Sequence, residues 1–132
     1  MNYVCYVFVR HLPHTLNPGK LAAQVHHAGT MLMYNYLNES ETKEWLKQGN
    51  GFGTTIILEA LEPSNFEQKI NNLMESNHEV IGGTIIDPTY PVDFELTCKC
   101  LTCAYLLLDK DSEDIKIKEL LNEIQTNWRL HK

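Results

Sequence analysis

Lys20, Gln24 and His27 are spaced four and three residues apart, which places them on one stripe of a helix. The stripe would present an ammonium, an amide and an imidazole, groups that bind anions, donate hydrogen bonds and exchange protons. Asp87, just before Pro88, would add a carboxylate able to orient His27 or hold a water molecule. The alternatives are ordinary: a solvated helix face for the first three, and a simple turn residue for Asp87.

Strands and helices are expected to alternate along the chain. Short runs rich in β-branched and aromatic residues predict strands at 3–9, 54–59, 80–86 and 102–108. Helical spacing of apolar residues predicts helices at 20–37, 40–46, from 64 to at least 74, and 112–129. This pattern predicts an α/β fold. We expect a single domain over residues 1–132, an α/β/α sandwich around a mixed sheet of four or slightly more strands.

The candidate residues would meet at one edge of that sheet. Lys20 follows the first strand and its loop, and open α/β sheets bind ligands at the carboxyl ends of parallel strands. If strands 3–9 and 80–86 are parallel neighbours, Asp87 lies at the same edge as the start of the helix. The spacing therefore predicts a polar site there.

The charge is unevenly distributed along the 132 residues. With 11 basic and 17 acidic side chains the net charge is −6, which argues against a protein that coats nucleic acid electrostatically. Residues 1–37, however, contain Arg10 and Lys20 and no Asp or Glu. This segment tolerates anions, although chance would also produce such a segment.

The cysteines and the apolar runs indicate a cytoplasmic protein without a metal or other cofactor. No apolar run approaches a membrane span, and no signal peptide is evident, so the four Cys are expected to be reduced thiols. Cys98, Cys100 and Cys103 form a C-x-C-x-x-C pattern that lacks a fourth ligand for zinc. Small buried thiols explain them better.

Residues 18–28, with Gly19-Lys20, two alanines, Gln24 and His27-Ala28, resemble the opening signature of the type II peptidyl-tRNA hydrolases. Three further segments match that family in the same order, so that the resemblance covers roughly residues 3–110. They are 44–58 with its Trp and Gly, 85–87 ending in Asp, and 102–107 opening with Thr.

The resemblance implies a small α/β sandwich with a mixed sheet, often a homodimer, that cleaves the ester joining a peptide to tRNA without a metal. By position, it assigns catalysis to Lys20, His27, Asp87 and Thr102. Substrate binding is expected from Gln24 and Lys20, together with Arg10 of the acid-free segment.

The segment after Asp87 departs from the family pattern. Pro91 stands where the family has a Thr, the connection up to Thr102 is longer, and residues 97–101 replace the usual turn. A second hypothesis is therefore an inactive module that binds a nucleotide or another phosphate-bearing ligand along Lys20–His27. A third is a protein-interaction domain that docks through helix 112–129.

Overall fold

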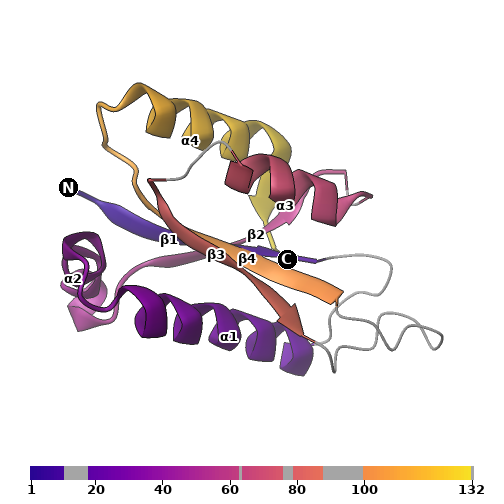
Figure 1. Ribbon diagram of the computed structural model, residues 1–132, viewed down its shortest axis with the longest axis horizontal. Helices are drawn as coiled ribbons and strands as arrows, with labels where there is room; N and C mark the ends of the chain where they lie inside the picture. The colour runs from indigo at the N-terminus through magenta and orange to yellow at the C-terminus, as the bar shows by residue number, and fades with distance from the viewer. Residues whose placement is uncertain (11–17, 63, 76–78, 88–99, 132) are drawn as a thin grey trace.

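A single five-stranded sheet organises the computed structural model, which describes residues 1–10, 18–62, 64–75, 79–87 and 100–131 (Figure 1). The strands are β1 (Tyr3–Val9), β2 (Thr55–Ala60), β3 (Ile81–Asp87), β4 (Cys100–Asp109) and β5 (Trp128–Leu130). The helices are α1 (Pro18–Tyr36), α2 (Ser40–Leu46), α3 (Phe66–Glu75) and α4 (Ile115–Asn127), with a short 3₁₀ helix η1 (Gly49–Gly51).

The strand directions make the sheet mixed, as the sequence predicts. The order is β3-β4-β1-β2-β5, with β1 parallel to β2 and the other neighbouring pairs antiparallel. The expectation that the first and third strands are neighbours is wrong, because the almost wholly apolar β4 lies between them. Both strands still run in the same direction. The carboxyl end of β3, at Asp87, therefore lies on the same edge of the sheet as the carboxyl end of β1.

Helices cover both faces of the sheet, with α1 and α2 on one face and α3 and α4 on the other (Figure 1). The alternation of β1 explains this arrangement, since successive side chains of a strand point to opposite faces. Cys5, Val7 and Val9 pack on the α1 face. Val4, Tyr6 and Phe8 pack on the α3 and α4 face. The α/β class is confirmed, with five strands in the sheet.

The C-terminal segment corrects the expected helix 112–129. The helix begins one turn late because Asp114, rather than Ser112, caps it by accepting hydrogen bonds from two backbone N–H groups. It ends at Asn127, and Trp128 starts β5, which pairs with β2. A strand here supplies backbone partners to the edge of β2 and still buries Trp128 in the core.

The apolar face of α4 packs against the core. Leu120 and Ile124 are buried in the same core as β1 and α3, so this face is used within the fold. Among the described residues, no helix has the length and apolar character needed to cross a membrane.

Candidate functional site

Helix α1 presents the predicted polar stripe toward the carboxyl end of β3 and the beginning of β4. Ala28 and Leu32 anchor the helix on the sheet with no exposed surface. Gln24, one turn before Ala28, is only 3 % exposed, whereas Lys20 and His27 are exposed on either side of it. The middle of the stripe, at Gln24, is therefore buried, whereas its two ends, at Lys20 and His27, are exposed to solvent.

A β-bulge brings Thr102 to the same place. Ile85 of β3 lies opposite Cys103 of β4, but the next residue, Ile86, lies opposite Leu101. Thr102 is thus the extra residue of β4, and a bulge of this kind redirects a side chain. Its hydroxyl reaches α1, as does the Cys103 thiol, which donates to the carbonyl oxygen of Gln24 at 3.3 Å.

Gln24 links Thr102 to Asp87 across the buried space between helix and sheet. The hydroxyl of Thr102 donates to Oε1 of Gln24 at 2.6 Å, and Nε2 of Gln24 donates to Oδ2 of Asp87 at 2.9 Å. The carbonyl oxygen of Ile85 lies 3.3 Å from the same hydroxyl as a weaker acceptor. These contacts fix the orientation of the amide, so that its N–H points at the carboxylate.

His27 completes the arrangement at the surface. Its Nε2 atom lies 3.8 Å from Oδ2 of Asp87, and the two side chains are 47 % and 15 % exposed. Gln24 therefore holds the Asp87 carboxylate from the buried side. On the solvent side, the carboxylate lies beside the imidazole of His27. A carboxylate and an imidazole side by side can hold a water molecule and move its proton.

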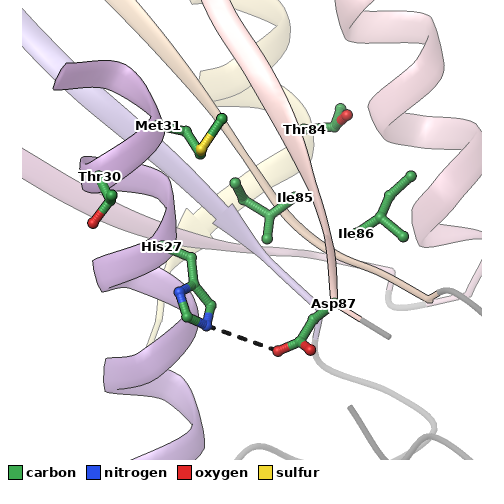
Figure 2. A pocket seen from close by; sticks show the side chains of 7 residues that line it. All are labelled: His27, Thr30, Met31, Thr84, Ile85, Ile86 and Asp87. Carbon is green, nitrogen blue, oxygen red and sulfur yellow. Dashed lines mark ion pairs between the residues drawn. The ribbon is translucent and has the colours of Figure 1, made fainter. Parts of the chain in front are cut away.

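A pocket of about 370 Å³ opens beside this pair, between α1 and β3 (Figure 2). Its walls come from one exposed stripe of the helix and the last residues of the strand: His27, Thr30 and Met31 from α1, and Thr84, Ile85, Ile86 and Asp87 from β3. The volume lies within the ~300–1,000 Å³ typical of small-molecule sites. Of these seven residues the sequence predicted His27 and Asp87 and missed the other five, of which Met31 could have been found. The signal was present, since it continues the spacing from Lys20 through His27 by four residues.

The structure gathers four of the six residues expected at the site, namely Gln24, His27, Asp87 and Thr102. Lys20 lies on the same stripe one helical turn before Gln24. Arg10 lies across the sheet. Its Nε donates to the carbonyl oxygen of Leu101 at 2.8 Å, and its guanidinium lies 5.2 Å from the Phe66 ring centre. The guanidinium thus lies on the α3 face of the sheet.

The remaining sequence features bear less on the site. Pro91 and Cys98 fall outside the described residues. Cys5 and Cys103 are free and buried, and burial raises the pKa of each thiol to about 12. Such thiols are unreactive near neutral pH. In the described ranges, no three His, Cys, Asp or Glu side chains gather in a group that could hold a metal ion.

The geometry carries the functional argument without support from known proteins. No protein-family model matches the chain, and no curated protein matches it in sequence. What the structure supplies is a carboxylate fixed by a buried amide, an adjacent imidazole and a pocket. These features can be tested directly.

Proposed function

We propose that this protein hydrolyses the ester that joins a peptide to tRNA, at the site formed by Asp87 and His27. The observation that carries the proposal is the chain from Thr102 through Gln24 to Asp87, which requires a β-bulge and two buried polar side chains. Buried polar groups are costly unless fully hydrogen-bonded, so a linked set aimed at a surface carboxylate favours a functional role. The resemblance to type II peptidyl-tRNA hydrolases supports the choice of substrate.

The positions of the side chains support the following reaction. Asp87 holds the attacking water, and His27 accepts its proton as the water oxygen bonds to the ester carbonyl carbon. The bond to the ribose oxygen then breaks, and the imidazolium returns the proton to that oxygen. Lys20, exposed at the start of α1, would stabilise the developing oxyanion or bind a phosphate of the tRNA.

Gln24 and Thr102 act as positioning residues in this scheme. Thr102 is fully buried and Gln24 nearly so, and their hydrogen bonds run to each other and to Asp87. Neither side chain is placed to contact a substrate outside the protein. Their effect on the reaction would pass through the orientation of the Asp87 carboxylate.

The pocket favours ester hydrolysis over the nucleotide-binding alternative. The described residues that line it include no Lys or Arg, and they include Asp87, whose carboxylate would repel a phosphate. Phosphate sites normally use backbone N–H groups and cationic side chains. The apolar contribution of Met31 and Ile85 instead fits the acyl part of an ester.

A hydrolysis assay with peptidyl-tRNA tests the proposal. The wild-type protein should release peptide, while Lys20→Ala and Asp87→Asn should lower the rate at least ~100-fold, in keeping with the loss of a positioned catalytic group. Lys116→Ala, which removes an exposed ammonium on α4, is the matched control and should be fully active. Absence of turnover by the wild-type protein would reject the proposal.

A further inference from the structure

Strand β3 lies at an edge of the described sheet, and its outer backbone groups face away from β4. The carbonyl oxygen of Thr102 accepts a hydrogen bond from the N–H of Arg10, the residue after β1, at 3.0 Å, so the next residue, Cys103, directs its backbone toward β3. Cys103 lies opposite Ile85, which therefore faces β4. Thr84, one residue earlier, then directs its N–H and C=O to the outer edge. In the described part of the chain, no strand pairs with that edge.

One end of this edge is closed by a side chain. The hydroxyl of Tyr36 donates to the carbonyl oxygen of Gly82 at 3.1 Å. Gly82 precedes Thr84 by two residues, and residues two apart in a strand direct their backbone groups to the same side. This contact therefore shows independently that the carbonyl groups of Gly82 and Thr84 point outward. The edge available to a partner therefore begins after Gly82 and ends at Asp87.

The pocket follows this same edge. Figure 2 shows Ile85 and Asp87 on the α1 side of β3, with Thr84 and Ile86 turned to the other side. All four line the pocket, which therefore extends around the edge of the strand. Ile86 is 53 % exposed and leaves an apolar surface there. The groove therefore runs beside the edge of β3 and ends at Asp87. Such a groove suits an extended peptide chain.

We propose that the peptide part of the substrate binds as an added strand along the outer edge of β3, paired with the backbone of Thr84. This inference rests on the proposed function, because it places the peptide that the ester carries. Strand addition recognises the main chain, whatever the sequence, which an enzyme acting on varied peptides requires. Side chains that face α1 would contact Met31 and Ile85.

The direction and the length of the added strand follow from the site. The ester is at the carboxyl end of the peptide and must lie at Asp87, so the peptide runs parallel to β3. In parallel pairing one residue donates to and accepts from two flanking residues of its neighbour. Thr84 can thus make two backbone hydrogen bonds, and the Tyr36–Gly82 contact limits the groove to about three peptide residues at ~3.3 Å each.

Esters of increasing length test this inference. We expect kcat/KM for acetyl-leucyl-tRNA, acetyl-alanyl-leucyl-tRNA and acetyl-dialanyl-leucyl-tRNA to rise about 10-fold in total, as two backbone hydrogen bonds are added. A fourth residue should add nothing. Substrates in which the backbone nitrogens are methylated cannot donate to the carbonyl oxygen of Thr84, and they should lose the part of this gain that comes from that hydrogen bond.

Thr84→Pro examines the same contact from the protein side. Proline removes the outward N–H, one of the two backbone hydrogen-bonding groups of Thr84, and is tolerated on strand edges, so the length dependence should fall by the contribution of one hydrogen bond. Thr84→Val keeps the N–H and should keep the dependence. Equal kcat/KM for all lengths, or no loss on N-methylation, would reject strand addition while leaving the hydrolase proposal intact. No turnover of any of the three esters would reject both.

Discussion

The hydroxyl of Thr102 donates to Oε1 of Gln24 at 2.6 Å, in a region where neither side chain has appreciable contact with solvent. The two residues are 78 positions apart in the chain. The bond depends on the extra residue in β4, which turns Thr102 toward α1. Because the amide has two ends, fixing its oxygen at Thr102 also fixes its N–H at Asp87. A bulge in the sheet thereby determines the orientation of a carboxylate at the surface.

Thr102→Val should weaken both folding and catalysis. Valine matches the shape of threonine but leaves Oε1 of Gln24 buried without its donor, which costs about 1–3 kcal/mol. The amide can then rotate, so kcat should fall by about 10-fold or more while KM changes little. Urea unfolding and steady-state kinetics with peptidyl-tRNA measure the two effects.

Thr102→Ser distinguishes positioning from packing. Serine keeps the hydroxyl and loses only a methyl group, so it should restore most of kcat even where some stability is lost. A serine variant as slow as the valine variant would show that the hydrogen bond to Gln24 does not govern the orientation of Asp87.

His27 and Asp87 should act as one unit. His27→Gln and Asp87→Asn should each lower kcat/KM by about 100-fold or more, and the double variant should be little slower than the worse single variant. His26 offers a matched control, because it is also exposed on α1 but lies about 100° around the helix. His26→Gln should retain full activity. Multiplicative losses in the double variant would mean that the two groups act independently.

The sequence predicted most elements to within one or two residues. Tyr3–Val9 and the helix that carries Gln24 follow directly from local patterns, since a continuous β-branched run and a repeated apolar spacing each have one stable solution. The grouping of Gln24, His27 and Asp87 also follows, because helical spacing and the carboxyl ends of strands place them at one edge.

Long-range pairing accounts for what the sequence did not reveal. Three features depend on contacts between distant segments: the insertion of β4 between β1 and β3, the bulge at Thr102, and the pairing of β5 with β2. No local pattern at Thr102 marks the bulge, and Trp128 suits an apolar helix face as well as a strand. The face on which Arg10 lies could not be predicted for a related reason, since the face that a residue occupies after a strand depends on register.

Trp128 should be one of the main contributors to stability. Its ring lies 4.8 Å from that of Phe8 and 6.2 Å from that of Phe66, both edge-to-face, so it joins β5 to β1 and α3. Trp128→Ala should lower the free energy of unfolding by about 3–5 kcal/mol. Leu130→Ala in the same strand is the control. Leu130 is 66 % exposed, and its loss should cost no more than ~0.5 kcal/mol.

The outcome for Trp128 separates the two descriptions of the C-terminal segment. If residues 128–130 were the end of a helix, the stability would not depend on pairing with β2. Glu59, the partner of Arg129, and Leu61, whose N–H donates to the carbonyl oxygen of Asn127 at 3.0 Å, should then show fast amide hydrogen exchange. We expect slow exchange at both in the wild-type protein and faster exchange in Trp128→Ala.

Stability should fall steeply in alkaline solution because two thiols are buried. Burial raises the pKa of Cys5 and Cys103 to about 12, whereas a thiol in the unfolded chain has a pKa near 9.0. Above pH 9 the unfolded state releases protons that the folded state retains. The stabilisation is therefore complete below pH 9 and is lost as the pH rises toward 12. Each thiol approaches a loss of about 1.4 kcal/mol per pH unit.

Cys5→Ala isolates the contribution of one thiol. Burial also raises the pKa of Tyr3, Tyr6 and Tyr105, so the comparison is best made between pH 9 and 10, below the usual range of tyrosine. Urea unfolding over this interval should show a shallower loss of stability in the variant than in the wild-type protein, by up to about half. Identical slopes would mean that Cys5 ionises as readily in the folded protein as in the unfolded chain.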